Sequence, residues 1–569
     1  MADEGGAKLT PLGKLISIVL IVGLIGVGAW IVVKRGIGGR PIGGGAAEGP
    51  EIEAPDTSGV TTVKEYKYVP GDRLPAVKGV SQYKWDASEK ILRFSYNVWA
   101  GWLPVIAANR GTKPNPDSVF AKKYGFRVDM VLMDDPVAAR DAFAAGEVHT
   151  LWGTADMMVL MAPELIRDSR TAPRIMQQID WSNGGDGIVV RSAIKSVADL
   201  KKKAVALAQN SPSEYYLTSL LLSAGLKPAD ISLRYTATAF EAAAAFVADR
   251  KVDACVSWAP DIYNIPERVA GTRILSTTAD ANKLIADVYA FRADFARDHP
   301  EIVEGLVAGI FEGMDLVKEK PEEAARWMAD AFGMKPDEIM SMRNDAHLTN
   351  FAENIQFFLN SSNPTNFERT WKNASYVYRE LGRISAPVAF DQVMDFSVLQ
   401  KLQQKGTFNH QKDEIVATFT PSSFRKIPAE APILTQTIRI NFFPNSANPY
   451  EPARDDLGNP IPGKLYDPNV SATLEQVARL SGQFARAVIL VEGHTDSSMK
   501  GKAPVQAVRD LSLARAEAIK RALIDKYKFD PNKFSIEGRG WDVPADPNDP
   551  MNQALNRRVE ISVFPPEQK

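Results

Sequence analysis

The chain has 569 residues, and its 67 Lys and Arg nearly balance its 69 Asp and Glu, which leaves a formal net charge of −2. A chain of this length exceeds one hydrophobic core and indicates roughly three or four structural units, while the balanced charge argues against a nucleic-acid partner. The lone Cys255 excludes an internal disulfide framework, and the five histidines lack the spacing of a zinc site, so neither a metal nor a cofactor is expected.

The N-terminal region contains a long apolar stretch. Residues 15–33, "LISIVLIVGLIGVGAWIVV", run for 19 residues without a charged side chain. A helix of this length just crosses the hydrocarbon core of a bilayer. A cleavable signal peptide normally has a shorter apolar region that ends in small residues, whereas this one ends near Trp30 and is followed by Lys34 and Arg35. Residues 1–35 are therefore predicted to be a cytoplasmic tail and one uncleaved transmembrane helix.

The orientation of this helix is ambiguous from its flanking charges. Two lysines precede the apolar stretch and three basic residues follow it, which by the positive-inside rule would place the bulk of the chain in the cytoplasm. The domains described below point to the periplasm instead, and we give them more weight. The stretch itself contains no ionisable residue, which argues against a role in carrying ions across the membrane.

Residues 36–83 are predicted to be a flexible linker and lead-in, because residues 36–59 are rich in Gly, Pro, Ala and Glu. Residues 84–405 then alternate between strand-like and helix-like runs, and the last part, from about residue 293, is mostly helical. Such alternation is typical of parallel βαβ units in an α/β fold. The predicted strands are residues 91–99, 127–133, 149–153, 187–192, 204–210, 231–236 and 253–258, and the main helices between them are residues 136–148, 213–226 and 239–251.

A second linker, residues 406–433, separates this region from a C-terminal unit, residues 434–569. The C-terminal unit reads as a strand, a helix, a strand, a helix and two further strands. This order predicts a small α+β sandwich with the helices on one face of the sheet. The predicted strands are residues 435–443, 487–495, 533–540 and 557–564, and the helices are residues 471–485 and 512–527.

The central region, about residues 91–333, contains the stretches "FAKKYGFRVDMVLMDDPVAARDAFAAGEVHTLWGTADMM", "SVADLKKKAVALAQNSPSEYYLTSLLLSAGLKPADISL", "AFVADRKVDACVSWAPDI" and "FARDHPEIVEGLVAGI". In these stretches it resembles the periplasmic solute-binding proteins for taurine, aliphatic sulfonates, nitrate and thiamine-precursor pyrimidines. The resemblance implies an α/β domain of two lobes, with a cleft that closes on a small molecule by a hinge motion.

Four loops supply the candidate ligand-binding residues of this cleft. In "NSPSE", Ser211 and Glu214 have capping-box spacing with Pro212 at the first helical position, which predicts a helix N-terminus with free N–H groups. The tryptophans of the four loops, together with Asp156 and Asp261, suit a cationic or heteroaromatic ligand better than a small oxyanion. The alternative is that these tryptophans pack in the core or at the hinge. The candidates are Trp99, Trp102, Trp152, Gly153, Thr154, Asn210, Ser211, Ser213, Trp258 and Asp261.

The C-terminal unit resembles the OmpA-like peptidoglycan-binding domain that MotB and Pal-type proteins share. The resemblance rests on "EGHTD" after a strand, "LSLARAEAIKRAL" on a helix, "IEGRGWDVP" and the terminal "NRRVEI". It implies that Asp496 and Arg515 grip the diaminopimelate of a peptidoglycan stem peptide. A zwitterionic amino-acid group needs a carboxylate for its ammonium and a guanidinium for its carboxylate.

Five more residues complete the predicted peptidoglycan site. A helix N-terminus beside Leu511 and Ser512 is expected to add backbone N–H donors. For Arg515 and for the two residues near the last strand, internal packing is the alternative. The chain departs from the family pattern by the insertion "SMKGKAPVQ" and by Val508, which stands where the family usually has Asn. The five additional residues are Thr495, Leu511, Ser512, Asn556 and Arg558.

His494 lies between Glu492 and Asp496 and suggests a metal site when it is considered alone. Alternation along the strand places Glu492 and His494 on one face of the sheet, while the resemblance gives the binding role to Asp496 at the turn. We therefore interpret His494 as a packing residue.

Together these features predict a non-enzymatic, single-pass protein of the bacterial inner membrane whose bulk lies in the periplasm. It would bind peptidoglycan at its C-terminal end and a small solute in its central cleft, which links solute sensing or uptake to the cell envelope, and a polytopic inner-membrane protein is a further possible partner. The alternative is a MotB-like stator or scaffold subunit with the central domain as a spacer. The sequence contains no G-x-S-x-G, Walker A or H-E-x-x-H motif, and no catalytic residue is predicted.

Overall fold

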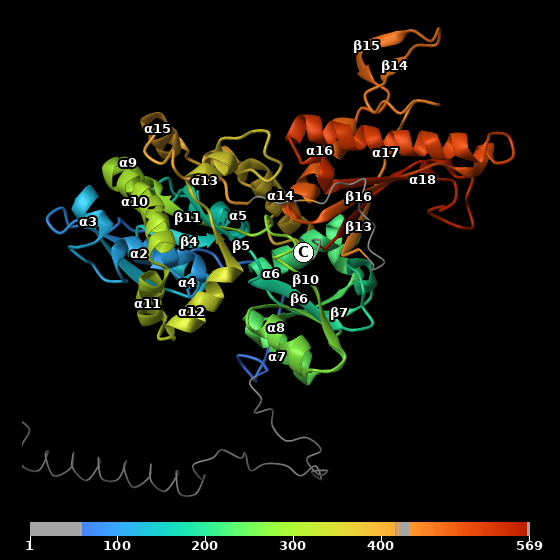
Figure 1. Ribbon diagram of the computed structural model, residues 1–569. Helices are drawn as coiled ribbons and strands as arrows, with labels where there is room; N and C mark the ends of the chain where they lie inside the picture. Colours follow the sequence, from blue (N-terminus) through green and yellow to red (C-terminus); the bar gives the residue numbers. More distant parts are fainter. Residues whose placement is uncertain (1–59, 416–418, 420–431, 566–569) are drawn as a thin grey trace, which may run out of the picture. The chain divides into compact units, whose positions relative to one another are not determined.

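The computed structural model of the chain describes residues 60–415, 419 and 432–565 (Figure 1). The predicted transmembrane helix at residues 15–33 and the spacer at residues 36–59 lie outside these residues. Over the described ranges, no helix is long and apolar enough to cross a membrane.

The central domain has two lobes. Lobe 1, which combines earlier and later segments of the chain, is built on a four-stranded sheet and a separate parallel strand pair. The sheet has the order β12 (Ala346–Leu348), β5 (Pro173–Ser182), β11 (Ala286–Arg292), β4 (Thr150–Thr154), and every neighbouring pair is antiparallel. The parallel pair is β2 (Ile91–Tyr96) and β3 (Arg127–Leu132). The helices of this part are α2 (Leu103–Asn109), α3 (Val119–Tyr124), α4 (Pro136–Ala144), α5 (Ala155–Leu165), α9 (Ala293–Asp298), α10 (Pro300–Glu319), α11 (Pro321–Phe332) and α12 (Pro336–Met342).

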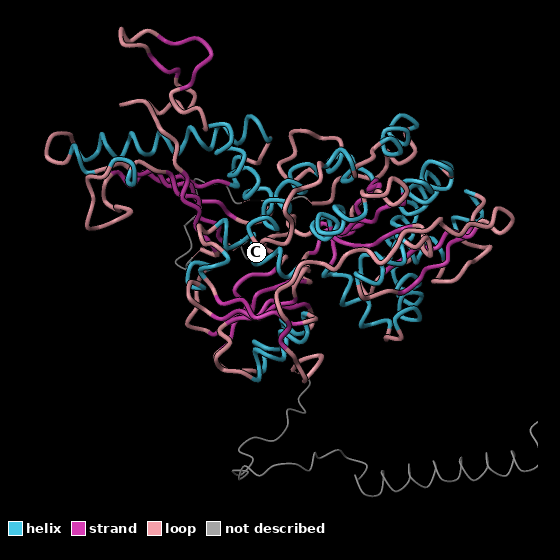
Figure 2. Tube along the Cα trace, turned by 180° about the vertical axis from the view of Figure 1, so that it is seen from behind, coloured by secondary structure: helices cyan, strands magenta, loops and turns pink. Residues whose placement is uncertain are grey.

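The second part, here called lobe 2, contains a mixed six-stranded sheet with helices packed against it (Figures 1 and 2). Its centre is the predicted βαβ arrangement, because β7 pairs in parallel with both β8 and β9. The strand order is β1 (Tyr68–Val69), β8 (Ser232–Thr236), β7 (Ala204–Ala208), β9 (Ala254–Trp258), β6 (Asp186–Arg191), β10 (Thr272–Thr277), and the helices are α6 (Pro212–Ser223), α7 (Ala239–Ala248) and α8 (Asp261–Arg268).

The prediction of parallel units was confirmed for β2 and β3 but was wrong for the four-stranded sheet of lobe 1 and for the β6 side of lobe 2. The reason is that two chain segments run between the sheets in opposite directions: β5 continues into β6 through residues 183–185, and β10 continues into β11 through residues 278–285. The backbone N–H of Ser182 donates to the carbonyl of Ile285 over 3.1 Å, which holds the two crossings together. We call this double crossing the hinge.

The hinge contains a glycine that cannot be replaced without rearrangement. A Cβ atom at Gly185 would lie 2.5 Å from the ring of Trp99, far inside van der Waals contact. The neighbouring Gly184 has a φ of +119°, a conformation that residues with a side chain rarely adopt. The sequence "NGG" at the crossing is therefore explained by close approach and by backbone conformation.

The remainder of the central domain is helical, as predicted. Its helices are α13 (Phe351–Phe358), α14 (Phe367–Glu380) and α15 (Ser397–Lys405). Short 3₁₀ helices punctuate the described chain. They are residues Ala100–Trp102, Val197–Leu200, Pro228–Asp230, Arg343–Asp345, Phe390–Gln392, Ser497–Met499 and Pro531–Lys533.

Residues 60–85, here called the strap, are bonded to both lobes. On lobe 2, β1 pairs with β8, and the backbone N–H of Asp72 donates to the side chain of Gln209 over 3.0 Å. On lobe 1, the buried guanidinium of Arg140 donates to the carbonyl of Pro75 over 2.7 Å. The strap thus connects the two lobes by hydrogen bonds.

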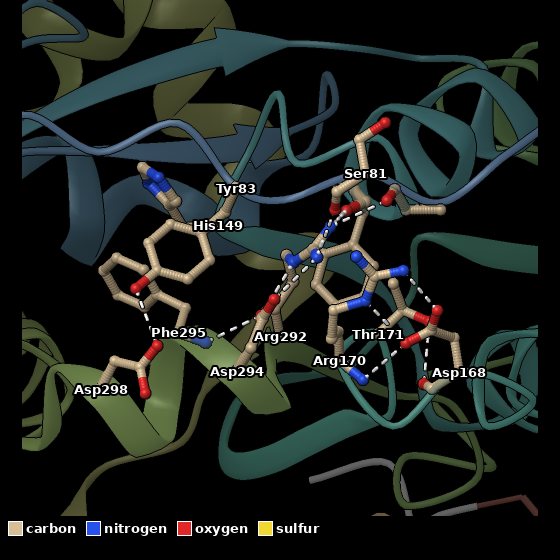
Figure 3. Close-up of polar contacts among 12 residues, drawn as sticks. Ser81, Tyr83, His149, Asp168, Arg170, Thr171, Arg292, Asp294, Phe295 and Asp298 are labelled. Carbon is tan, nitrogen blue, oxygen red and sulfur yellow. Dashed lines mark hydrogen bonds and ion pairs between the residues drawn. The ribbon is translucent and has the colours of Figure 1, made fainter.

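The lobe 1 end of the strap is fixed around Arg292 (Figure 3). This side chain is fully buried, pairs with Asp294 at 2.9 Å and donates to the carbonyl of Ser81 over 2.9 Å. The hydroxyl of Tyr83 donates to Asp298 over 3.0 Å. A buried guanidinium must satisfy its N–H groups, and here it does so partly by binding the strap.

The C-terminal domain has the predicted order of elements. Its sheet is β13 (Leu434–Ile438), β18 (Val559–Phe564), β16 (Val488–His494), β17 (Phe534–Gly540), with β16 and β17 parallel and the other pairs antiparallel. Helices α16 (Val470–Gln483) and α17 (Val505–Tyr527) lie on one face of this sheet (Figure 1), and the domain also contains the hairpin β14 (Pro452–Arg454), β15 (Pro460–Leu465) and the single turn α18 (Gln553–Asn556).

Helix α17 lies close to the sheet because two strand positions lack a side chain. A Cβ atom at Gly493 would lie 2.0 Å from the backbone oxygen of Ser512, and one at Gly538 would lie 2.5 Å from that of Arg509. The glycines of "EGHTD" and "EGRG" therefore set the distance between helix and sheet, and with it the distance between Asp496 and Arg515.

Candidate functional site

Asp496 lies at the turn directly after β16 and is 5% exposed. One of its carboxylate oxygens accepts the N–H of Ser498 over 2.9 Å, and the other accepts the Nε–H of Arg557 over 2.6 Å. Burial raises the pKa of Asp496, but the hydrogen bonds from Ser498 and Arg557 outweigh burial and hold that pKa below its usual value. Asp496 is thus a buried, ionised carboxylate.

Arg515 projects from α17 and is 6% exposed. Its Nε–H donates to the carbonyl of Ser446 over 3.1 Å, and its guanidinium lies 4.8 Å from the centre of the Phe442 ring. Burial and the neighbouring Arg557 lower the pKa of Arg515 to about 10, while Asp496 acts in the opposite direction. In the part of the chain that the structure describes, no carboxylate forms an ion pair with Arg515. Its charge is therefore available to an anionic group of a ligand.

Arg557 is a member of this site that the sequence analysis missed. Its neighbours Asn556 and Arg558 were predicted instead, but the structure gives both of them internal partners. The amide of Asn556 is fully buried and binds the backbone of Ala545, and Arg558 pairs with Glu560 at 2.6 Å. Arg557 follows the single turn α18, and the sequence gives no local signal that it reaches Asp496.

The predicted helix N-terminus beside Leu511 and Ser512 was wrong. Helix α17 begins at Val505, about two turns earlier, because Pro504 of the insertion precedes it and starts the helix. The two residues therefore lie inside the helix, and their N–H groups are not free donors at a terminus. The hydroxyl of Ser512 accepts the N–H of Gly540 over 3.0 Å, which ties α17 to β17.

The three side chains of the apparent metal corner have different neighbours. Glu492 pairs with Arg539 at 2.7 Å, and His494 lies 3.9 Å from a carboxylate oxygen of Glu560. Burial and Arg558 lower the pKa of His494 to about 4, so this 2%-exposed imidazole is neutral at physiological pH. These contacts agree with the interpretation of His494 as a packing residue.

A pocket of about 620 Å³ lies beside the Asp496 turn. Lys500 and Lys502, the two lysines that line the pocket, come from the insertion that distinguishes this chain from the family pattern. Thr495, which precedes Asp496, has a buried hydroxyl with no protein partner over the described residues. The pocket is lined by Ser497, Ser498, Lys500, Lys502, Trp541, Asp542, Pro544, Pro550 and Met551.

In the central domain, several predicted ligand-binding residues lie in the core of lobe 1. Trp102 is fully buried and its indole N–H donates to Asn97 over 2.7 Å. Trp152 is 6% exposed and donates to the carbonyl of Met133 over 2.8 Å. Gly153 lies opposite Val288 in the sheet, and the hydroxyl of Thr154 accepts the N–H of Met157 at the start of α5.

The predicted capping box at α6 was wrong, although Pro212 does occupy the first turn. The hydroxyl of Ser211 donates to the carbonyl of Ala208 over 2.8 Å and does not cap the helix. The carboxylate of Glu214 pairs with Arg383 at 2.7 Å and also accepts the N–H of Asn210 over 2.7 Å. The side chain of Glu214, which the predicted capping box required, is therefore ion-paired with Arg383 from a distant segment of the chain.

Asp261 at the start of α8 is held by the strap. Its fully buried carboxylate accepts both the N–H of Thr62, over 2.9 Å, and the Thr62 hydroxyl, over 2.7 Å. The predicted Ser213 on α6 is fully buried, and its hydroxyl has no partner over the described ranges. Asp261 therefore lies on α8 with its carboxylate bonded to the strap, and Ser213 lies on α6 with a buried hydroxyl.

Two predicted tryptophans lie at the hinge, each beside an aspartate that the sequence analysis did not select. The half-buried Trp99 donates its indole N–H to Asp180 over 3.0 Å. The half-buried Trp258 lies directly opposite Asp186 in the register of β9 and β6.

Four aspartates meet at the hinge, and we call them the acid cluster: Asp156, Asp180, Asp186 and Asp287. None is more than 8% exposed. Asp180 and Asp287 face each other across β5 and β11, and Thr154, two residues before Asp156, faces Asp287 across β4. Three of the four, in "IDW", "NGGD" and "IADVYAF", are isolated acids beside apolar or glycine residues, which was the available sequence clue.

Burial is the main cause of the high proton affinity of this cluster. It raises the pKa of Asp156 to about 6 and those of Asp180 and Asp186 to about 7. Burial and the neighbouring Asp180 raise the pKa of Asp287 well above its usual value. Carboxylates this close to one another cannot all be ionised without a compensating positive charge.

Comparisons with known proteins match two separate regions of the chain, one in the central domain and one in the C-terminal domain. Residues 122–324 match the NMT1/THI5 like family and residues 464–558 match the OmpA family. Outer membrane protein Omp38 of Acinetobacter baumannii is 35% identical over 99 residues, which are 17% of this chain and 26% of that protein. The taurine-binding periplasmic protein of Escherichia coli (strain K12) is 25% identical over 210 residues, which are 36% of this chain and 62% of that protein.

Among solved structures, the periplasmic aliphatic sulphonate binding protein SsuA from Escherichia coli covers 60% of this chain and 98% of its own, with 21% identity and a TM-score of 0.42. The chain spans about a quarter and about three fifths of the lengths of the two curated relatives. On the two family matches, the chain carries a domain like the NMT1/THI5 like family in its central part and an OmpA-family domain at its C-terminal end.

Proposed function

We propose that the chain fastens to peptidoglycan through its C-terminal domain and binds a small solute in its central domain, without catalysing a reaction. The observation that carries the proposal is the position of Asp496 and Arg515 on neighbouring elements of an OmpA-family domain. Both are more than nine-tenths buried, and one presents a negative and the other a positive charge. Such a pair suits the ammonium and carboxylate groups of one amino acid.

In this mechanism, the amino-acid end of a diaminopimelate side chain enters between the turn after β16 and helix α17. Its ammonium binds the carboxylate of Asp496, where it shares the acceptor with Arg557. Its carboxylate binds the guanidinium of Arg515, which is held in position by Phe442 and Ser446. The pocket beside Ser497 gives room for the rest of the stem peptide.

The membrane anchor and the location complete the proposal. The apolar residues 15–33 would fix the protein in the bacterial inner membrane, with its bulk in the periplasm, where peptidoglycan is found. A reporter fused at the C-terminus tests this: activity of a periplasmic reporter is expected, and activity only of a cytoplasmic reporter contradicts it.

Binding of the full chain to purified peptidoglycan sacculi tests the central claim. A charge-assisted hydrogen bond contributes about 1.5–3 kcal/mol, so Asp496→Ala and Arg515→Ala should each weaken binding about 10- to 100-fold. Arg521→Ala is the matched control, because Arg521 is on the same helix, is exposed and pairs with Glu517 at 3.0 Å. Unchanged sedimentation of the double variant Asp496→Ala, Arg515→Ala with sacculi would contradict the proposal.

One observation favours the alternative, in which the central domain is a spacer in a stator or scaffold complex. The indole N–H groups of Trp102 and Trp152 are satisfied by the protein itself, so these side chains serve the core. Calorimetric screening of the full chain against sulfonates, nitrate, pyrimidines and amines distinguishes the two functions. A saturable heat supports solute binding, and silence of all four classes supports the spacer.

A further inference from the structure

The acid cluster has an unusual pattern of satisfied and unsatisfied oxygens. Asp156 accepts the hydroxyl of Tyr378 over 2.8 Å, Asp180 accepts the indole of Trp99, and Asp186 accepts the hydroxyl of Ser182 over 2.7 Å. In each of these three carboxyl groups, the second oxygen is buried and has no partner among the described residues. Thr154 beside Asp156, Asp287 beside Asp180 and the Trp258 indole beside Asp186 lower the pKa of these groups, but none of them forms a well-aligned hydrogen bond to the second oxygen.

A neighbouring amide adds to these free acceptors. Gln178 is fully buried, its NH₂ group donates to the backbone oxygen of Asp180 over 3.1 Å, and its own side-chain oxygen has no partner in the described part of the chain. Buried polar atoms without partners are rare and costly. Four such acceptors within one region indicate that a donor-rich group completes them.

No lysine or arginine of the described chain compensates the negative charge of the cluster. None of its four aspartates forms an ion pair with Lys or Arg over residues 60–415 and 432–565, whereas the nearby Glu214 is paired with Arg383. Only His347 acts in the compensating direction, on Asp180. The central domain therefore pairs the buried carboxylate of Glu214 with an arginine, whereas the four aspartates of the acid cluster have no lysine or arginine partner among the described residues.

The group that could donate hydrogen bonds to these acceptors is either a metal-free cation with N–H donors or a neutral donor. No three His, Cys, Asp or Glu side chains of the described residues are grouped closely enough to hold a metal ion. A primary ammonium carries one positive charge and three N–H donors, and it can also lie against an indole ring such as that of Trp99 or Trp258. A quaternary ammonium has the charge but no N–H to donate.

We propose that the acid cluster binds the primary ammonium group of a small organic amine. This inference rests on the proposed solute-binding function of the central domain and names its ligand class. A ligand whose only charge is a sulfonate would meet four carboxyl groups, which oppose it. Binding of an ammonium would offset one negative charge of the cluster and hold the strands of both lobes together at the hinge.

Isothermal titration calorimetry on the full chain tests the proposal with chemically matched probes. Putrescine, ethanolamine and taurine carry a primary ammonium, choline carries a quaternary ammonium, and ethanesulfonate is taurine without its amine. We expect saturable binding of at least one primary amine and none of ethanesulfonate or choline. Asp180→Asn and Asp186→Asn should each weaken amine binding about 10- to 100-fold, as expected for one lost charge-assisted contact. Asp141→Asn, which alters a lobe 1 aspartate paired with Arg140, should leave it unchanged.

The outcomes separate this inference from the broader function. Ethanesulfonate binding that is unaffected by Asp186→Asn, or choline binding as tight as that of the amines, overturns the ligand class but leaves solute binding in place. Amine binding that persists in both aspartate variants also overturns it. If neither these probes nor the sulfonates, nitrate and pyrimidines give a heat of binding, both the amine ligand class and solute binding by the central domain are overturned. Melting curves of each variant verify that the asparagine proteins are folded.

Discussion

Stability against pH provides a direct test of the buried carboxyl groups at the hinge, and Asp186→Asn is the most informative change. Asparagine keeps the size of the side chain and an oxygen for the Ser182 hydroxyl, but it cannot ionise. In the native protein, burial raises the pKa of Asp186 to about 7 from an ordinary value of 3.8. The folded state therefore binds this proton more tightly than the unfolded state does.

The sign and size of the effect follow from that difference. The stabilisation is fully present below about pH 4 and is lost as the pH rises through about 7, because the folded protein must then release a proton that it holds tightly. A tenfold change in proton affinity is worth about 1.4 kcal/mol, so Asp186 alone lowers the free energy of unfolding by up to about 4 kcal/mol between these limits. The Asn variant should lose this slope and be the more stable protein at pH 8.

Urea unfolding of the full chain at pH 5, 6, 7 and 8, followed by tryptophan fluorescence, measures this slope. The transitions of the two domains must be fitted separately, because such a chain does not unfold in one step. Asp391→Asn, at an exposed position of the central domain, is the matched control and should retain the native slope. Equal slopes in the native protein and in Asp186→Asn would refute the reasoning.

Three further variants test separate parts of the structure. Arg383→Met leaves the fully buried Glu214 without its ion-pair partner and should lower the stability of the central domain by about 3–5 kcal/mol, measured by urea unfolding; a loss below about 1 kcal/mol would contradict the pairing. Gly493→Ala places a methyl group 2.0 Å from the Ser512 oxygen and should destabilise the C-terminal domain by about 1–3 kcal/mol in calorimetry, whereas an unchanged transition would show that α17 can move away freely. Arg557→Ala removes a hydrogen bond that lowers the pKa of Asp496, so that pKa should rise in a carboxyl NMR titration, and an unshifted pKa would exclude the contact.

The C-terminal domain was the more predictable part of the fold. Its motifs are local: "EGHTD" follows a strand, and the order of strands and helices can be read from hydrophobic periodicity. What failed there was a helix boundary, because the insertion before Val505 lengthened α17 and moved its N-terminus away from Leu511. Arg557 was missed because it acts through a contact with Asp496, 61 residues earlier in the chain.

The central domain was harder to predict because its site depends on strand pairing between distant segments. Asp180 and Asp287 are more than 100 residues apart in sequence and become neighbours only through the antiparallel pairing of β5 with β11. The predicted parallel arrangement did not include these two strands. The capping box at Ser211 failed for a similar reason, since Arg383 on a later segment draws Glu214 away from it.

Strand β1 of the strap has a consequence for solubility. It is only two residues long, but it pairs with β8 and so covers part of an edge of the six-stranded sheet. An uncovered sheet edge presents free N–H and C=O groups that recruit strands from other molecules. A shortened protein that begins at residue 84 would leave β8 bare, and it should self-associate where the longer protein stays dispersed.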